Sequence, residues 1–182
     1  MKFYIPEGYK PQLGIKETEI AIKEIKDYFE RELAKQLNLT RVSAPWFVRA
    51  DSGLNDNLNG VERPVSFDIK EQNEAVVEIV QSLAKWKRMA LKRYGFAVGE
   101  GLYTDMNAIR RDEDTDNIHS VFVDQWDWEK IINKSDRNEE TLKETVRLVY
   151  KALKNTEKYI AGKYNYTEEI LPDEIYFVKS QE

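Results

Sequence analysis

The residues with the clearest potential for chemistry lie between Asn107 and Trp128, where an arginine, a charged loop and an alternating segment follow one another. From Ser120 to Trp128, β-branched and aromatic side chains occupy nearly every second position, which predicts an extended strand. Its two faces carry different sets: Val121, Val123, Gln125 and Asp127 on one, and Phe122, Asp124, Trp126 and Trp128 on the other. An amide and a carboxylate on one face, with Arg110 at the mouth of the preceding loop, can hold a small zwitterion beside a phosphate.

A run of basic residues forms a second candidate site. It comprises Lys85, Lys87, Arg88, Lys92 and Arg93. On a helix such a run is more often a solvent-exposed face than a binding site, and that interpretation is favoured. The functional alternative concerns Lys87, which lies near the start of a predicted helix and can reach a ligand at the end of the preceding strand. Ser82 and the free backbone amides beside it would attract a carboxylate there.

The acidic segment Asp112-Glu113-Asp114, with Asp116, has two interpretations that the sequence leaves open. Runs of this kind are usually exposed loops. Flanked by arginines, the segment could also position Mg²⁺ and a nucleotide, since Mg²⁺ prefers one or two carboxylates together with phosphate oxygens. His119, the single histidine, is expected to be a structural or surface residue rather than a general base.

Several catalytic motifs are absent from the sequence. There is no nucleotide-binding glycine loop of either common type, no zinc-hydrolase His-Glu-x-x-His and no serine-hydrolase Gly-x-Ser-x-Gly. The chain has no cysteine, so thiolate chemistry and disulfide bonds are excluded. A net charge of −5 argues against nucleic-acid binding. With 41% hydrophobic residues and no leader or membrane-spanning segment, the 182 residues predict a single cytoplasmic unit.

The elements that position these residues are predicted from periodicity and turn signals. Residues 1–14 are expected to form an irregular arm, residues 17–37 a helix with one buried stripe, and 39–45 a strand ending at a proline. An Asp/Asn/Gly-rich loop at 50–60 is a candidate binding loop. The remaining predicted elements are strands at 64–70 and 75–80, a helix capped by Ser82 and closed near Gly95, a helix opened by a capping box at 141–144, and a strand at 175–178.

Blocks of residues along nearly the whole chain resemble the ammonia-dependent asparagine synthetases, also called aspartate-ammonia ligases. The matching blocks are Asp-Asn-Leu-Asn-Gly at 56–60, Ser-Leu-Ala-Lys-Trp-Lys-Arg at 82–88, Gly-Glu-Gly-Leu-Tyr-Thr at 99–104, Arg110 with 112–114, the segment 119–129, and 177–182. This resemblance implies an α+β fold like that of class II aminoacyl-tRNA synthetases, with a mostly antiparallel sheet flanked by helices. It also implies a homodimer, because the 17–37 helix and the strand ending at Pro45 match the family's dimer-forming motif.

The chemistry that the resemblance implies is ATP-dependent activation of the side-chain carboxylate of L-aspartate, followed by displacement of AMP by ammonia. Arg110 matches the family's arginine that bridges the α-phosphate and the attacking carboxylate, and Glu113 with the backbone near Ile118 matches positions at the nucleotide. Mg²⁺ is expected to accompany ATP, with ligands that the sequence does not identify.

The amino-acid pocket implied by the same match consists of Asp56, Lys87, Gln125 and Asp127, with Ser82 adjoining it. In the roles assigned, Lys87 and Ser82 hold the α-carboxylate, and Gln125 and Asp127 hold polar groups of the substrate. Asp56 lies near the entering nitrogen and takes its proton or orients it.

Departures from the family pattern qualify this match. Val123 stands where relatives place a stacking phenylalanine, Val61 where some carry cysteine, and Gln81 where others carry histidine. Family members also continue for about as much chain again, so the 182 residues resemble the N-terminal part of the catalytic domain, and alone they are expected to be inactive. The alternatives are a non-catalytic amino-acid-binding or regulatory relative and, less favoured, an RNA-contacting synthetase core.

Overall fold

The computed structural model of the chain describes residues 3–56, 58–165 and 169–179. It divides into two compact units, one formed by Met1–Lys10 with Thr40–Ile131 and the other by Pro11–Leu39 with Ile132–Glu182. The prediction that the chain is a single structural unit stays a prediction. None of the helices in the described ranges is both long and apolar enough to cross a membrane.

The first unit is built around two three-stranded sheets. One has the order β1-β5-β6 and the other β2-β4-β3. Their bounds are β1 Leu39–Arg41, β5 Gly101–Ile109 and β6 Phe122–Lys130, and β2 Phe47–Arg49, β3 Ser66–Ile69 and β4 Ala75–Ile79. The pairs β5–β6, β2–β4 and β3–β4 are antiparallel. The predicted α+β fold with mostly antiparallel sheet is therefore confirmed.

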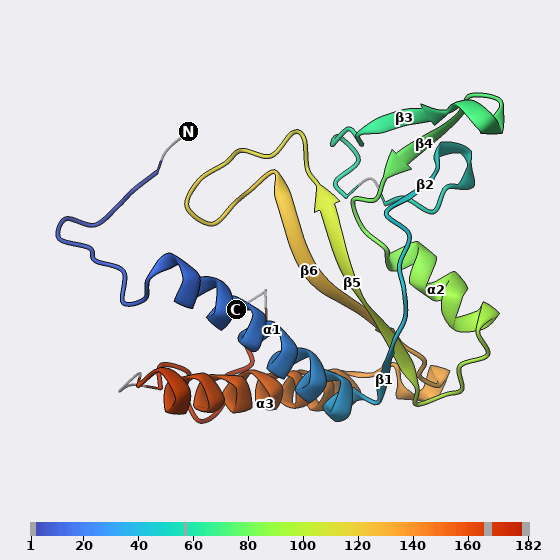
Figure 1. Ribbon diagram of the computed structural model, residues 1–182. Helices are drawn as coiled ribbons and strands as arrows, with labels where there is room; N and C mark the ends of the chain where they lie inside the picture. The colour runs from blue at the N-terminus through green and yellow to red at the C-terminus, as the bar shows by residue number, and fades with distance from the viewer. Residues whose placement is uncertain (1–2, 57, 166–168, 180–182) are drawn as a thin grey trace. The chain divides into compact units, whose positions relative to one another are not determined.

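The long β5–β6 hairpin, seen in Figure 1 as two curved ribbons with α2 beside them, supplies the framework of the candidate site. Its register places Met106 opposite Gln125 and Thr104 opposite Asp127. Leu102, Met106 and Ala108 belong to the buried core together with residues of α2, and Val123 packs against it. The face that carries Gln125 and Asp127 is thus the face covered by α2, which agrees with the alternation predicted from the sequence.

The predicted cap at Ser82 is wrong, and helix α2 (Ala84–Arg93) starts one residue later than that cap would place it. Leu83 occupies the N-cap position without any side-chain cap, because its apolar side chain is completely buried in the core. The Ser82 hydroxyl still accepts a hydrogen bond from the Ala84 amide at 3.3 Å. The helix ends at Arg93, close to the predicted end near Gly95, whose φ of +75° lies in the left-handed region that glycine tolerates.

The other predicted elements of the first half differ from the structure mainly at their ends. The 17–37 helix is α1, Ile15–Leu37, and the strands at 64–70 and 75–80 shorten to β3 and β4. Of the strand predicted at 39–45, only residues 39–41 form a strand, which is β1. The sequence did not predict the short strand β2. Residues 3–14 carry no regular element, as expected of the arm, and residues 1–2 lie outside the described ranges.

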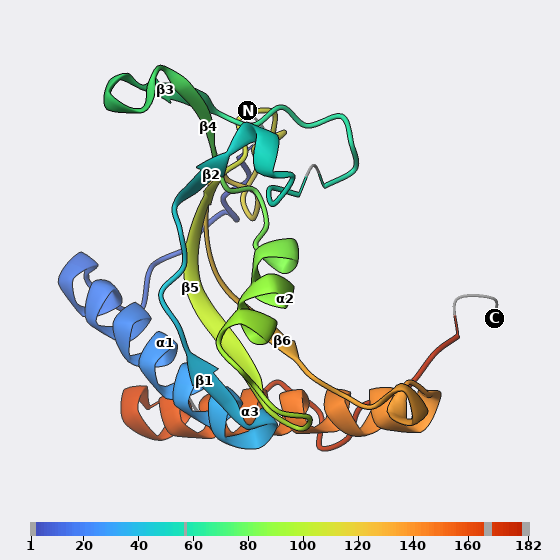
Figure 2. The same cartoon turned by 90° about the vertical axis from the view of Figure 1, so that its right-hand side faces the viewer.

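The second unit is a pair of packed helices, α1 and α3 (Glu139–Tyr164), which lie side by side in Figures 1 and 2. Tyr28 and Tyr159 stack with ring centroids 4.2 Å apart, and the Asn155 amide donates to Glu32 at 2.8 Å. Lys163 forms an ion pair with Glu24. Of the buried stripe predicted for residues 17–37, Leu33 and Leu37 are buried, whereas Ile22 and Ile25 are exposed, so that prediction is wrong for the N-terminal part of the helix.

Two predictions for the C-terminal part are wrong. Helix α3 is capped by Asn138, whose side chain accepts from the Thr141 amide at 2.9 Å, so the helix begins before the predicted capping box at 141–144. Residues 175–178 form no strand, because no strand among the described residues pairs with them. The Phe177 ring instead lies 5.3 Å from the Arg147 guanidinium on α3. A β-rich sequence needs a neighbouring strand before it can form a ladder.

Candidate active site

A buried ion pair forms the centre of the amino-acid side of the candidate site. Lys87, in the first turn of α2, is completely buried and pairs with Asp127 of β6, whose side chain is 25% exposed. The pair follows from the packing of α2 on the Asp127 face of the hairpin. An ammonium removed from water in this way needs its counter-ion nearby. The favoured interpretation of the basic run as a solvent-exposed face is therefore wrong for Lys87, whereas Lys85, Arg88, Lys92 and Arg93 are exposed.

Gln125 lies two residues before Asp127 on the same face of β6. Its side-chain nitrogen is 3.0 Å from the sulfur of Met106, the residue opposite it in the hairpin. A thioether is a weak acceptor, so this contact leaves most of the hydrogen-bonding capacity of the amide unused. The structure thus brings Lys87, Asp127 and Gln125 together as the sequence predicted, with a carboxylate and an amide carried by one rigid strand.

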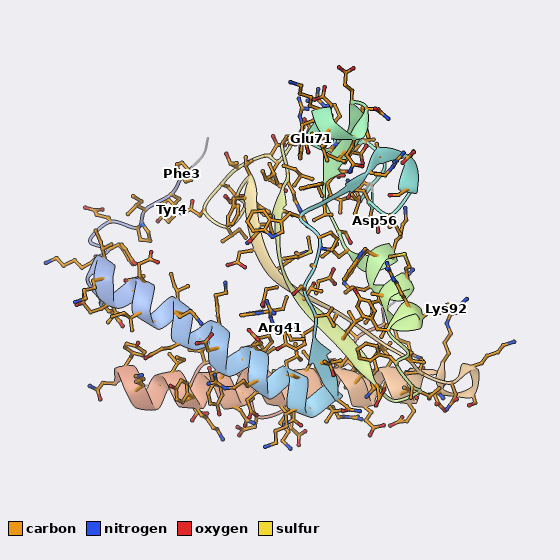
Figure 3. All side chains as sticks on the ribbon, turned by 45° about the vertical axis from the view of Figure 1, so that its right-hand side comes forward. Phe3, Tyr4, Arg41, Asp56, Glu71 and Lys92 are labelled. Carbon is orange, nitrogen blue, oxygen red and sulfur yellow. The ribbon has the colours of Figure 1, made fainter. Side chains whose placement is uncertain are left out.

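Asp56 is presented by the loop that precedes β3, and Figure 3 shows it beside the start of α2. Asp56 is partly buried, and its carboxylate makes no hydrogen bond or ion pair with the residues that the structure describes. The residue before it, Asn55, is 6% exposed, and its side-chain oxygen accepts a hydrogen bond from the backbone amide of Gln81 at 2.9 Å. Ser82 directly follows Gln81, so the Asn55–Gln81 contact brings the Asp56 loop to the Ser82 end of α2.

Asn55 and Gln81 were missed as parts of this site. An asparagine in an Asp/Asn/Gly-rich loop is usually a turn former, and the sequence carried no signal to distinguish a buried one. Gln81 is completely buried, and neither side-chain amide atom has a hydrogen-bond partner in the described ranges. From the sequence, Gln81 stands out only because other family members carry histidine at this position.

Arg110 lies just beyond the end of β5, where its backbone amide bonds to the Val121 carbonyl at 2.8 Å. Its Nε is buried and has no hydrogen-bond partner within the described residues. The side chain lines a cavity of about 550 Å³ whose walls are Leu58, Asn59, Glu62, Arg110, Asp112, Glu113 and His119. Arg110 and Glu113 are thus brought together, beside the loop that follows Asp56. Lys87, Gln125 and Asp127 do not line this cavity.

The charged loop after Arg110 is held by its own acidic residues. Asp112 accepts hydrogen bonds from the backbone and side-chain nitrogens of Arg63 at 2.9 and 3.0 Å, and the Arg63 guanidinium lowers the pKa of Asp112 to about 2. Asp116 accepts from the amides of Ile118 and His119, each at 2.9 Å, which lowers its pKa. Because these carboxylates favour the ionised state, the loop is tied down at neutral pH.

The predicted roles of Ile118, His119 and the metal can be compared with this geometry. The Ile118 side chain is 86% exposed and its amide is bonded to Asp116, while His119 Nδ1 lies 2.8 Å from the same carboxylate. His119 thus has the hydrogen-bonded position expected of a structural histidine. No group of three or more acidic, histidine or cysteine side chains in the described ranges could hold a metal ion. Asp112 and Asp116 already have partners, and Glu113 lines the cavity together with Arg110.

The fold belongs to the class II aminoacyl-tRNA synthetase type. Similar solved structures include a pyrrolysyl tRNA synthetase, PylSc, from Desulfitobacterium hafniense, at 14% identity and a TM-score of 0.50 over 76% of this chain and 50% of that one. Another is described as an ATP phosphoribosyltransferase regulatory subunit/histidyl-tRNA synthetase from Bacillus halodurans C, at 15% identity and a TM-score of 0.56 over 84% and 38%.

The family model for aspartate-ammonia ligase matches residues 16–182, and the chain belongs to that family. Relatives named aspartate--ammonia ligase include one from Clostridium perfringens, 67% identical over all of this chain and 54% of its own length. One from Ruminiclostridium cellulolyticum is 68% identical over 97% of this chain and 53% of its own length. The chain therefore spans about half the length of the curated relatives it matches.

Proposed function

We propose that this chain provides the amino-acid-binding part of an ATP-dependent ligase that converts L-aspartate and ammonia into L-asparagine through a β-aspartyl-adenylate, releasing AMP and pyrophosphate. The observation that carries the proposal is the buried Lys87–Asp127 pair beside Gln125 on one face of β6. A fixed cation, anion and amide are the groups needed to orient an amino-acid zwitterion. Membership of the aspartate-ammonia ligase family makes L-aspartate the substrate that these groups would bind.

In this proposal the substrate lies between α2 and β6. Asp127, the accessible member of the ion pair, receives the α-ammonium of aspartate and Ser82 receives the α-carboxylate, while the completely buried Lys87 acts on that carboxylate through its charge. Gln125 donates to or accepts from the polar groups that remain. Because Lys87 is buried, its charge acts in a poorly solvated environment and favours an anion beside it more strongly than an exposed lysine would.

Activation of the side-chain carboxylate requires two anions to meet. The proposed role of Arg110 is to place its guanidinium between the α-phosphate of ATP and the attacking carboxylate, where it offsets their repulsion and stabilises the charge of the transition state. Glu113 and the backbone near Ile118 would lie at the nucleotide, with Mg²⁺ held mainly by phosphate oxygens. The Arg110 Nε is buried and has no hydrogen-bond partner among the residues that the structure describes, which supports an anionic ligand at this position.

The second step needs a neutral amine. Ammonium must lose a proton before its nitrogen can attack the adenylate, and a fixed carboxylate can accept that proton. Asp56 has this role in the proposal because it is partly buried and its carboxylate has no hydrogen-bond or ion-pair partner in the described chain. The nitrogen then displaces AMP, and the new amide bond gives asparagine.

The test compares the 182-residue chain with a chimera in which the same residues are followed by the remaining length of the Clostridium perfringens relative. We expect the chimera to form asparagine and AMP from aspartate, ATP and ammonia, and the 182-residue chain to form none. A folded chimera that binds aspartate but makes no adenylate would contradict the ligase and favour a non-catalytic amino-acid-binding relative. Homodimerisation and a cytoplasmic location stay predictions that this experiment does not address.

A further inference from the structure

Asn55 joins three parts of the chain through three side-chain hydrogen bonds and one to its backbone carbonyl. Its amide nitrogen donates to the Glu78 carboxylate at 3.1 Å and to the Ile79 carbonyl at 3.2 Å, both on β4. Its oxygen accepts from the Gln81 amide at 2.9 Å, directly before α2. Its backbone carbonyl accepts from the Lys85 ammonium at 3.3 Å, in the first turn of that helix.

The residues on either side of Asn55 show why this contact matters. Leu54 packs against the buried core, and Asn55 itself is 6% exposed, so the chain is anchored at two consecutive positions. Asp56 follows immediately and is only partly buried. Asn55 is thus the anchored residue that directly precedes Asp56.

We propose that Asn55 is a positioning residue that fixes the Asp56 carboxylate against the start of α2 and thereby controls the ammonia step. This inference rests on the proposed function and adds a residue to which no role had been assigned. Asn55 does not touch the substrate, and it acts through the orientation of Asp56. A misplacement of about 1 Å at a reacting group can cost on the order of 100-fold in rate, which is the scale of effect that loss of the Asn55 contacts would produce.

The chemistry of the two steps gives a readout specific to this role. Adenylation depends on Arg110 and the amino-acid pocket, whereas amide formation also depends on Asp56. Aspartate-dependent exchange of pyrophosphate into ATP reports adenylation alone, and asparagine formation reports both steps. A displaced Asp56 should therefore slow asparagine formation while pyrophosphate exchange continues.

The experiment uses the chimera described above, with the variants Asn55→Ala, Asn55→Asp and Asp56→Asn. Asn55→Ala removes all three side-chain hydrogen bonds. Asn55→Asp keeps the acceptor for the Gln81 amide but replaces the donor nitrogen by an oxygen facing the Glu78 carboxylate. The matched control is Asn133→Ala, because Asn133 also makes short side-chain hydrogen bonds, to Asp136, in a turn that carries none of the candidate site residues.

We expect both Asn55 variants to lower asparagine formation about 10- to 100-fold at neutral pH, with exchange reduced less than about threefold. Asp56→Asn should show the same selective loss, and the control should change neither rate. The loss of asparagine formation should shrink at higher pH, because more of the ammonium is then already deprotonated to ammonia. A parallel loss of both rates, or a deficit that does not depend on pH, would overturn the positioning role and indicate a purely structural residue.

The same measurements separate this inference from the proposed function. If the unmodified chimera shows neither exchange nor asparagine formation, the ligase proposal fails. If it shows both and Asn55→Ala leaves their ratio unchanged, only the positioning role fails. Hydrogen exchange at the Gln81 amide in the 182-residue chain tests the contact directly, since protection should be lost in Asn55→Ala and retained in Asn55→Asp.

Discussion

The two sides of the candidate site are constructed differently. On the amino-acid side, Lys87 and Asp127 project from a helix and a strand that pack on one another, and the lysine is withdrawn completely from solvent. On the proposed nucleotide side, Glu113 and Ile118 lie in a loop without regular structure between β5 and β6. Groups carried by packed elements keep their geometry, whereas loop residues can adapt when a ligand arrives.

The ion pairs in the two regions also differ in how much they should contribute to stability. Lys87 and Asp127 meet in the interior, while Arg63, which holds the nucleotide loop through Asp112, has a side chain that is 67% exposed. A charge in the interior becomes costly when its partner is removed, and an exposed pair contributes little because water replaces the partner. The Lys87–Asp127 pair should therefore contribute to the stability of the fold, whereas the Arg63–Asp112 pair should mainly keep its loop ordered.

The largest expected effect is on stability, and it tests the amino-acid side. Replacing Asp127 by Asn leaves the Lys87 ammonium buried without a counter-ion, which should lower the free energy of unfolding by about 3 to 5 kcal/mol. The matched control is Glu129→Gln, two residues along the same face, where Arg88 lies 3.5 Å away and is 68% exposed. Its cost should stay below about 1 kcal/mol.

Urea unfolding of the 182-residue chain measures both substitutions under the same conditions. Equal costs for Asp127→Asn and Glu129→Gln would show that the buried pair is no more important to the fold than the exposed one. The contrast between the two sides of the site would then lose its energetic basis.

The second prediction concerns turnover and tests the nucleotide side. In the chimera, Arg110→Ala should lower kcat by about 10²- to 10³-fold, because a donor that stabilises transition-state charge is lost. Unfolding should hardly change, since the side-chain Nε has no protein partner to lose in the described chain. Arg110→Lys should recover only part of the rate, because lysine cannot bridge two anions in a bidentate manner. Steady-state kinetics with varied ATP would contradict this role if KM rose and kcat did not fall.

The smallest expected effect is a local titration of the nucleotide loop. The folded-state pKa of Asp112, about 2, lies below its ordinary value of 3.8. The Arg63 contact therefore favours the ordered loop at pH values above about 4, and this contribution disappears as the pH falls towards 2. Carbon-detected NMR of the Asp112 carboxyl group can follow the change, and Arg63→Ala should return the pKa towards 3.8. An unchanged pKa in that variant would show that Arg63 does not control the loop.

Much of the framework was predictable because its signals are local. Alternation from Ser120 to Trp128 placed Gln125 and Asp127 on one face, and β6 confirms that arrangement. The three- and four-residue spacing between 17 and 37 predicted α1 to within two residues at its start. The predictions that failed depended on distant partners. Leu83 and not Ser82 occupies the N-cap position of α2, and residues 175–178 have no strand to pair with among the described residues.

The sequence by itself determined which side chains share a face, because periods of 2 and 3.6 residues follow from backbone geometry alone. It also determined the family, through blocks of residues spread along the chain. Only the tertiary structure decided that Lys87, alone among five neighbouring basic residues, is buried against Asp127, and that Asn55 ties the Asp56 loop to the start of α2. Burial and long-range hydrogen bonds depend on which elements pack together, and that information does not reside in any short stretch of the chain.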